Sequence, residues 1–461
     1  MLSIGEGNVY LKRKKSMELK IARRPHSAFR IILAGFAAVI LAGALLLMLP
    51  LSSKSGSVTS FEHALFTSTS AVCVTGLIVK DTALYWSGFG QAVILVLIQI
   101  GGLGVVTVAA FIETTAGKKL SLLERNLLED SLSAFQVGGM VRMTRFIFRT
   151  AILTELAGAV AMMPVFCREY GMQGIWMSVF HSVSAFCNAG FDLMGTHSGA
   201  FSSLTAYSGR FGIVLPVCLL IILGGIGFLT WHDMLTYKTD FRKYRMQSKV
   251  ILVTTAILIL IPAVLYYLFE FSASPLKDRL ALSLFQAVTP RTAGFNTADL
   301  TKMTGAGITL MIVLMLIGGS PGSTAGGMKT TTVTVLLANA LAVFQRKKNA
   351  ELFRRRIEDS TIKTASAILM LYIALTLIGG GVISLAEGLP MGTCLFETAS
   401  AAGTVGLTLG ITSGLGTLSH AILIALMFFG RVGGLTLMYA AISARRSDEA
   451  GRRPVEKINV G

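Results

Sequence analysis

Residues 73–77 read Cys73-Val74-Thr75-Gly76-Leu77, and this pattern of small or hydroxyl residues, a lone glycine and then Leu or Phe occurs four times. The later copies are Cys187-Asn188-Ala189-Gly190-Phe191, Arg291-Thr292-Ala293-Gly294-Phe295 and Gly403-Thr404-Val405-Gly406-Leu407. The four glycines lie 114, 104 and 112 residues apart, so one unit is repeated four times. In a membrane protein, four such loops on one axis can form a ring of backbone carbonyls that replaces the water around a cation. The repeat therefore predicts a pore.

The composition is that of a polytopic membrane protein. Of 461 residues, 53% are hydrophobic and 14% are charged, which is more apolar surface than a soluble fold can bury. The net charge is +17, and 31 of the 41 Lys and Arg residues fall in five blocks: 1–30, 116–149, 233–249, 345–363 and 445–461. Their alternation with apolar runs follows the positive-inside rule, which predicts a multi-pass protein of the cell membrane with both termini in the cytoplasm. Anionic lipid explains these blocks without a nucleic-acid partner.

Long and short apolar runs alternate along the chain. Eight runs are predicted to span the membrane, near residues 31–50, 88–112, 146–167, 210–232, 250–270, 305–340, 364–386 and 417–444. Four shorter runs suit re-entrant half-helices, near residues 61–72, 175–186, 279–290 and 392–402. We therefore predict an all-α integral membrane fold, with four pseudo-repeats of span, re-entrant pore helix and span around one central pore. The predicted boundaries are a cytoplasmic basic lead at 1–30, repeats at 31–115, 116–235, 236–345 and 346–445, and a cytoplasmic tail at 446–461.

Two further features recur in each unit. Every half-helix has an early Phe and a late Ser or Thr: Phe66 and Ser70, Phe180 and Ser184, Phe285 and Thr289, Phe396 and Ser400. The following span carries a glycine-rich stretch that starts 25, 34, 24 or 24 residues after the loop glycine, at Gly101, Gly224, Gly318 and Gly430. Close helix packing explains any one of these stretches. Their similar phase in all four units supports the repeat.

The loop glycines suggest how backbone alone could hold a cation. Glycine adopts φ angles closed to other residues, which lets successive carbonyls point the same way. Each half-helix also directs its partially negative C-terminal end at the membrane centre. For any single loop a flexible turn is the alternative. The predicted selectivity filter is Val74, Thr75, Gly76, Asn188, Ala189, Gly190, Thr292, Ala293, Gly294, Thr404, Val405 and Gly406. The predicted cation ligands are the backbone carbonyls of Cys73, Val74, Thr75, Cys187, Asn188, Ala189, Arg291, Thr292, Ala293, Gly403, Thr404 and Val405.

These loops, with the stretch 290–296 and the glycine-rich run of the third unit, resemble the Trk/Ktr/HKT superfamily of cation-translocating subunits over roughly residues 28–445. The single short basic lead before the first span is similar to KtrB-type membrane subunits rather than to the longer TrkH type. Serine replaces the first filter glycine in some sodium-selective plant relatives. Because Gly76 and its three counterparts are all glycine, the resemblance favours K⁺ as the ion in the filter.

The second span of the third unit is interrupted by Gly318-Gly319-Ser320-Pro321-Gly322-Ser323-Thr324-Ala325-Gly326-Gly327-Met328-Lys329. Proline and five glycines cannot hold a regular helix there. Unwound backbone at this depth survives where protein or water satisfies its polar groups, so we predict that it lines the conduction path beneath the filter. A kinked helix packed against its neighbours is the alternative. The run resembles the intramembrane loop that acts as a gate in the family, and we hypothesise that it must move for ions to pass.

Three basic residues fall within the predicted membrane region. Arg431 is predicted to contact carbonyls of the 318–329 loop, as an analogous Arg does in the family, and Lys329 belongs to the same predicted gate. Arg291 adjoins a filter loop, where a free positive charge would repel cations. We therefore predict that it points away from the axis and pairs with an acid, for which Glu397 is the candidate.

Three acidic residues have open roles. Glu155, alone in an apolar span, is interpreted as a hydrogen-bonded structural acid rather than a proton relay. Asp192 and Asp299 follow the second and third filter loops. They could concentrate cations at the mouth, or be solvated loop acids.

The sequence thus predicts the ion-translocating subunit of a potassium uptake system, with a sodium-conducting or sodium-coupled transporter of the same superfamily as the alternative. An enzyme is not predicted, because no H-E-x-x-H or Walker pattern is present. No covalent or nucleotide cofactor is expected, only transported K⁺. The resemblance implies a homodimer and a cytosolic ring of nucleotide-binding, RCK-type regulatory subunits. The basic loops at 118–149, 238–249 and 346–363 are candidate docking surfaces, and contact with membrane lipids explains them equally well.

Overall fold

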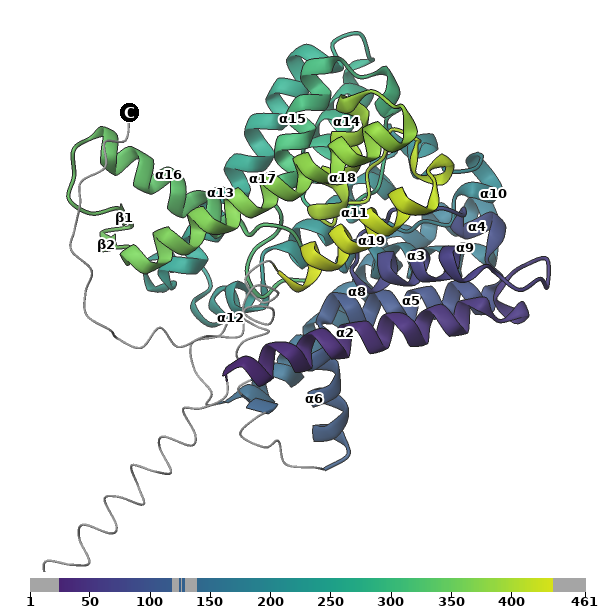
Figure 1. Ribbon diagram of the computed structural model, residues 1–461, viewed down its shortest axis with the longest axis horizontal. Helices are drawn as coiled ribbons and strands as arrows, with labels where there is room; N and C mark the ends of the chain where they lie inside the picture. Colours follow the sequence, from purple (N-terminus) through teal and green to yellow (C-terminus); the bar gives the residue numbers. More distant parts are fainter. Residues whose placement is uncertain (1–24, 118–123, 126, 129–138, 434–461) are drawn as a thin grey trace, which may run out of the picture.

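The computed structural model describes residues 25–117, 124–125, 127–128 and 139–433, and this part of the chain is mostly helical (Figure 1). The predicted tail at 446–461 and most of the predicted lead at 1–30 lie outside the described residues. The first unit contains α2 (Pro25–Met48), η1 (Pro50–Ser52), α3 (Phe61–Val72), α4 (Thr82–Tyr85), α5 (Gly88–Leu103) and α6 (Val105–Thr115). The second contains α8 (Met140–Tyr170), α9 (Gln173–Phe186), α10 (Gly195–Ser198), η2 (Thr205–Tyr207), α11 (Phe211–Gly225) and α12 (Phe228–Tyr237).

The second half of the chain repeats this order with one difference. The third unit contains η3 (Phe241–Lys243), α13 (Met246–Leu265), η4 (Tyr266–Glu270), α14 (Leu276–Val288), η5 (Leu300–Lys302), α15 (Gly305–Leu316) and α16 (Thr330–Phe344). A two-stranded antiparallel hairpin follows, β1 (Glu351–Leu352) and β2 (Arg355–Arg356), with Glu351 opposite Arg356. The fourth unit contains α17 (Asp359–Glu387), α18 (Met391–Ala402), η6 (Thr412–Gly414) and α19 (Thr417–Val432). The difference is the gap between α15 and α16, where the sequence predicts an unwound loop.

The short helices α3, α9, α14 and α18 match the four predicted half-helices within a few residues. Their early phenylalanines have no exposed surface: Phe66, Phe180, Phe285 and Phe396. Each half-helix packs against the first helix of its own unit, namely α2, α8, α13 and α17. The units also close on one another, through the pairs α5 with α9, α11 with α14, α15 with α18, and α19 with α3. The four half-helices therefore stand in a circle in chain order.

Four described helices are long and apolar enough to cross a membrane: α2, α8, α13 continued through η4, and α17. Two predicted continuous spans are bent instead. The run at 88–112 breaks between α5 and α6 by 95°, and the run at 210–232 breaks between α11 and α12 by 98°. Gly104 and Gly227 stand at the breaks with φ of 89° and 87°, which only glycine adopts without strain. Both predicted runs are apolar over their whole length, and each is a span if its bent pair is taken together.

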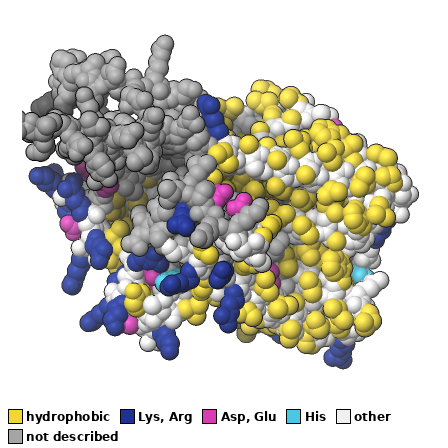
Figure 2. All heavy atoms as spheres, turned by 90° about the horizontal axis from the view of Figure 1, so that it is seen from below, with side chains coloured by type: hydrophobic (Ala, Val, Ile, Leu, Met, Phe, Trp, Pro, Cys, Tyr) yellow, Lys and Arg dark blue, Asp and Glu magenta, His cyan; other side chains and the backbone are white. Residues whose placement is uncertain are grey.

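The outer surface has two kinds of region. Apolar side chains of the long helices face outward, with Leu45 62%, Val160 64% and Leu260 63% exposed, as lipid contact requires. In Figure 2, Lys and Arg side chains gather toward the left end, whereas hydrophobic side chains cover most of the right. In the matching view of Figure 1, β1 and β2 lie at the left end and the short helices α4 and α10 at the right. The molecule therefore has a basic end, where the β1–β2 hairpin lies, and an opposite end, where α4 and α10 lie.

Candidate functional site

The four glycine loops share one backbone conformation. Their glycines have positive φ: Gly76 90°, Gly190 70°, Gly294 77° and Gly406 92°. The residue two positions earlier is also left-handed in every loop: Val74 50°, Asn188 57°, Thr292 69° and Thr404 52°. This region costs a non-glycine residue about 1–2 kcal/mol, so its recurrence at equivalent places shows that the surroundings impose it. Alternation of left-handed residues with residues of ordinary φ is the backbone pattern that the predicted arrangement of carbonyls needs.

The four loops also meet. A methyl group built on Gly76 would lie 2.6 Å from the carbonyl oxygen of Ala189 in the next unit, and one on Gly190 would lie 2.7 Å from that of Ala293. Two further pairs close the circle. A methyl group on Gly294 would overlap the carbonyl oxygen of Val405, and one on Gly406 would overlap that of Thr75. Each glycine thus faces the carbonyl that precedes the next glycine. A side chain at any of the four positions would collide with this circle, which explains the strict recurrence of glycine.

The late Ser or Thr of each half-helix ties its loop in place. In the first and fourth units the glycine N–H donates to a hydroxyl, Gly76 to Ser70 and Gly406 to Ser400, both at 3.0 Å. In the second and third units the hydroxyl donates to the carbonyl after the glycine, Ser184 to Phe191 at 2.7 Å and Thr289 to Phe295 at 2.5 Å. All four hydroxyl residues are fully buried. The recurring late Ser or Thr therefore anchors the loop to its half-helix.

A cavity of about 230 Å³ lies outside the circle and is lined by all four glycines together with Asp192 and Asp299. Burial raises the pKa of Asp192 to about 7, although the N–H of Met194 donates to its carboxylate at 2.9 Å. Hydrogen bonds from Thr301 and Lys302 hold the pKa of Asp299 below its usual value. The two predicted mouth acids thus share one cavity with the glycine circle, and their protonation differs near neutral pH.

The interrupted segment between α15 and α16 is unwound and mostly buried. Ser320 and Thr324 have no exposed surface. The N–H of Ser320 donates to the carbonyl of Gly225 at 3.0 Å, and that of Thr324 to Gly224 at 3.2 Å. The Thr324 hydroxyl donates to the carbonyl of Phe186, the last residue of α9, at 2.8 Å. The second unit therefore supplies acceptors for backbone groups that no helix satisfies.

The same segment contacts the fourth unit. The N–H of Gly327 donates to the carbonyl of Gly430 at 3.1 Å. A methyl group on Gly327 would lie 2.8 Å from the carbonyl oxygen of Gly403, and one on Gly326 would overlap the side chain of Thr404. The segment is thus packed directly against the fourth glycine loop.

Two basic side chains hold the interrupted segment. Arg431 donates to the carbonyl of Thr324, as the sequence predicts, and also to Gly101 and Gly102 of the first unit. Lys329 donates to the carbonyl of Ala325 at 2.8 Å. Both cations are satisfied by carbonyl oxygens, and Arg431 links the segment to a second unit.

The recurring glycine-rich stretches have a packing role in three units. A methyl group on Gly101, Gly224 or Gly430 would overlap the last carbonyl of the half-helix in the same unit, at Val72, Phe186 and Ala402 respectively. In the third unit Gly318 instead lies against the carbonyl of Gly326 in the interrupted segment. Close packing against the half-helix explains Gly101, Gly224 and Gly430. In the third unit, Gly318 packs against the interrupted segment instead.

The predicted pair of Arg291 and Glu397 is wrong. Arg291 donates to the hydroxyl of Thr255 at 3.2 Å, and its Nε is buried without a partner. Glu397 contacts the hydroxyl of Thr412, and its second oxygen is likewise unpartnered. Residue type and nearness to the filter suggested the pairing. In place of the predicted carboxylate, Arg291 contacts the hydroxyl of Thr255 on α13. In place of the predicted guanidinium group, Glu397 contacts the hydroxyl of Thr412, which follows the fourth loop.

Other buried polar groups support the loops. Gln99 donates to both carboxylate oxygens of Glu155, at 3.0 and 3.3 Å, which agrees with a hydrogen-bonded structural acid. The sequence did not lead us to predict Gln99 as the partner of Glu155. The available signal was its amide side chain, which stands alone in an apolar run. Nor did the sequence lead us to predict a role for His420, which contacts Glu62 at 2.7 Å through Nδ1 and the carbonyl of Thr412 at 2.9 Å through Nε2.

Four short helices whose loops meet in one circle, surrounded by long apolar helices, define a multi-pass helical membrane protein. The TrkH family model, described as a cation transport protein, matches residues 2–451. The chain is 40% identical to the potassium/sodium uptake protein NtpJ of Enterococcus hirae, over 96% of this chain and 99% of that protein. It is 37% identical to the Ktr system potassium uptake protein B of Bacillus subtilis, over 91% and 94%. The crystal structure of the potassium transporter TrkH from Vibrio parahaemolyticus matches with a TM-score of 0.73 at 18% identity, over 91% of this chain and 86% of that one. The chain belongs to the TrkH family of cation transport proteins.

Proposed function

We propose that this chain is the ion-translocating subunit of a potassium uptake system. The observation that carries the proposal is the circle of four glycines, each facing the carbonyl that precedes the next. Backbone oxygens in this arrangement can exchange for the water around a cation without any side-chain charge. The C-terminal ends of the four half-helices add a favourable potential at the same place. The filter is Val74 to Gly76 and the three equivalent triplets, with K⁺ at their carbonyls and at the residue before each triplet.

The segment 318–329 is the gate of this pathway. Its support is its position, packed against the fourth filter loop and tied to the second unit by Ser320 and Thr324. The segment is mostly buried and lies against the fourth filter loop, on the proposed path from the filter to the basic end. It must therefore move for ions to pass, and Arg431 and Lys329 hold it in the blocking position.

The full arrangement has four repeats with the boundaries given above, eight spans and both termini in the cytoplasm. The basic end then faces the cytoplasm, in keeping with the positive-inside rule. The relatives from Bacillus subtilis are named as components of a Ktr system. As the resemblance to KtrB-type subunits implies, we propose that the chain works as a homodimer with a cytosolic ring of nucleotide-binding subunits.

Sodium transport is the second candidate, and one observation favours it. The relative from Enterococcus hirae, which aligns over nearly the whole chain, is named a potassium/sodium uptake protein. The glycine circle favours K⁺, because none of its four positions carries the serine of sodium-selective relatives.

Ion-replacement flux into liposomes that contain the purified chain separates the two candidates. The potassium proposal expects K⁺ to enter faster than Na⁺, and the Gly76→Ser variant to lose this preference. Equal entry of Na⁺ and K⁺ by the unchanged chain would favour the sodium reading. Entry of neither ion, with a correctly folded protein, would remove both.

A further inference from the structure

A second pocket lies at the basic end of α13, at the far end of that helix from the filter mouth. Its volume is about 200 Å³, and it is lined by Arg242, Lys243, Tyr244, Arg245, Met246, Lys249, Phe353 and Arg355. Five of these eight residues are cationic. They come from two parts of the chain that are about a hundred residues apart, the segment 241–249 and the β1–β2 hairpin.

One ring contact joins the two parts. The rings of Phe241 and Phe353 meet edge to face with centroids 6.4 Å apart. The ammonium group of Lys249 lies 5.8 Å from the centre of the Phe241 ring and donates to the carbonyl of Arg242 at 2.8 Å. The pocket is therefore a defined feature of the fold rather than a chance approach of two loops.

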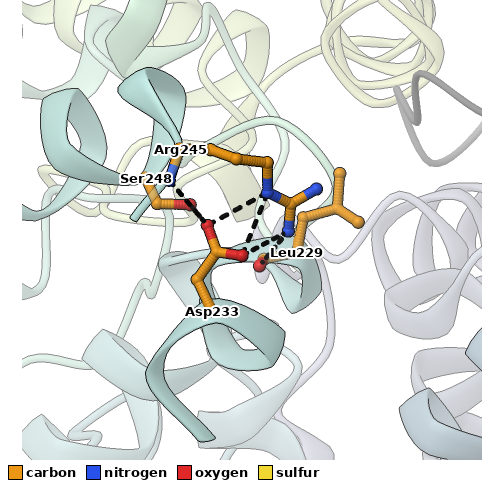
Figure 3. Close-up of polar contacts among 4 residues, drawn as sticks. All are labelled: Leu229, Asp233, Arg245 and Ser248. Carbon is orange, nitrogen blue, oxygen red and sulfur yellow. Dashed lines mark hydrogen bonds and ion pairs between the residues drawn. The ribbon is translucent and has the colours of Figure 1, made fainter. Parts of the chain in front are cut away.

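Arg245 is fixed at the edge of the pocket (Figure 3). Its Nε and Nη2 donate to the carboxylate of Asp233 at 2.8–3.0 Å, and Nη2 also donates to the carbonyl of Leu229 at 2.9 Å. The hydroxyl of Ser248 donates to the same carboxylate at 2.6 Å. A bidentate pair of this kind orients the guanidinium group and neutralises it.

The positive charge of the pocket is only partly balanced. Asp233 pairs with Arg245, and Asp240 pairs with Lys243 at 3.0 Å. Within the described part of the chain, Arg242, Lys249 and Arg355 have no carboxylate within ion-pair distance. Mutual repulsion opposes such a cluster unless an anion occupies it. The positive end of the 20-residue α13 adds to the potential, although Asp233 already accepts the N–H of its N-cap residue Arg245 at 3.2 Å.

The surface that continues from the pocket is apolar. Val253, Ile257 and Leu260 follow Lys249 at helical spacing along α13, and they are 41%, 49% and 63% exposed. A molecule with its anionic group at Lys249 would lay an attached apolar chain along this stripe. Phe241 and Phe353, each more than 40% exposed, add apolar surface at the pocket itself.

We propose that this pocket binds the phosphate headgroup of an anionic phospholipid, with the acyl chains along α13. Arginine supplies paired donors that match phosphate oxygens, and Lys249 supplies a point charge. The apolar stripe favours a lipid over free phosphate, since only a lipid uses both surfaces. The proposal does not depend on which ion the chain transports.

The test uses the purified full chain and its Arg242→Gln/Arg355→Gln variant, which leaves Arg245 and its partner Asp233 unchanged. The control replaces two exposed cations outside the pocket, Lys277→Gln/Lys302→Gln. Affinity for phosphatidylglycerol is measured by native mass spectrometry, by titration into protein held in a neutral detergent. Phosphatidylcholine and inorganic phosphate are the comparison ligands. Thermal unfolding of each protein alone verifies that the variants are folded.

Loss of two basic groups from a membrane-surface site should weaken phosphatidylglycerol binding about thirtyfold. The control variant should bind like the unchanged protein, and phosphatidylcholine should bind weakly to all three. Equal affinity of the pocket and control variants for phosphatidylglycerol would overturn the proposal. Competition by millimolar inorganic phosphate that removes the lipid completely would assign the site to free phosphate and overturn the lipid source. The test does not measure ion flux, so a result against the lipid proposal would leave the transport proposal unchanged.

Discussion

At the scale of single residues, the filter loops depend on glycine for two separate reasons. Gly76 has a φ of 90°, and a methyl group there would lie 2.6 Å from the carbonyl oxygen of Ala189. The first reason is local strain, and the second is the close approach of the next unit. Gly410 allows the two reasons to be tested separately. It also has a φ of 90°, but nothing lies within 4 Å of a methyl group added to it.

We expect Gly76→Ala to abolish selective K⁺ uptake, and Gly410→Ala to retain most of it. Both variants carry the backbone strain of about 1–2 kcal/mol, but only Gly76→Ala also displaces the carbonyl of a neighbouring unit. Uptake by cells that lack their own potassium transporters measures the difference, with expression levels matched. Equal loss in the two variants would mean that backbone strain alone governs the loop.

Asp192 predicts a dependence of transport on external pH. Because burial raises its pKa to about 7, the carboxyl group is mostly neutral below this pH and gains its negative charge above it. One carboxylate several ångströms from a hydrated cation is worth somewhat under ~1 kcal/mol. Uptake at low K⁺ should therefore rise roughly threefold between pH 6 and pH 8 and should lose this rise in Asp192→Asn. At saturating K⁺ the rise should vanish in both proteins, and an unchanged pH profile in Asp192→Asn would contradict the role.

At the scale of elements, the C-terminal part of each half-helix is packed against the loop that follows it, and in three units also against the next helix. Its late Ser or Thr binds the filter strand, and in three units a glycine of the following helix packs on its last carbonyl. The half-helix, loop and second helix of a unit therefore form one packed body. The position of the loop depends on the absence of side chains at Gly101, Gly224 and Gly430.

Replacement of Gly101 by Ala should destabilise the protein by about 1–3 kcal/mol or more, because the added methyl group overlaps the carbonyl of Val72. The matched control is Gly381→Ala in the middle of α17, where nothing lies within 4 Å of the added methyl group. That change should raise stability slightly, since Ala is the better helix former by about 1 kcal/mol. Thermal unfolding in one detergent compares them, and similar midpoints for the two variants would remove the packing argument.

At the scale of the whole molecule, four units close into a circle, and the third differs from the rest. Much of this arrangement could be predicted from the sequence, because the glycine pattern and the short apolar runs recur with the unit. Hydropathy could not reveal the bends at Gly104 and Gly227, since the residues on both sides remain apolar. The partners of Arg291 and Glu397 were also out of reach, because they depend on Thr255 and Thr412, which no pattern singles out. The gate and filter roles stay predictions.

If the segment 318–329 is the gate, as proposed, replacement of residues 319–327 by a short linker should raise K⁺ flux through the purified chain in liposomes. Arg431→Gln, a milder change, removes the link between Thr324 and the first unit and should shift flux in the same direction. Unchanged flux in both folded variants would count against a gate at this segment.

The most direct measurement is an experimental structure of the protein in Rb⁺ or Tl⁺, heavier ions that substitute for K⁺ and can be located by anomalous scattering. The account predicts a peak inside the circle of Gly76, Gly190, Gly294 and Gly406, with backbone carbonyls of all four loops around it. Density for the ion only at side chains of the mouth, or none on the central line, would contradict the claim that these carbonyls select the transported ion.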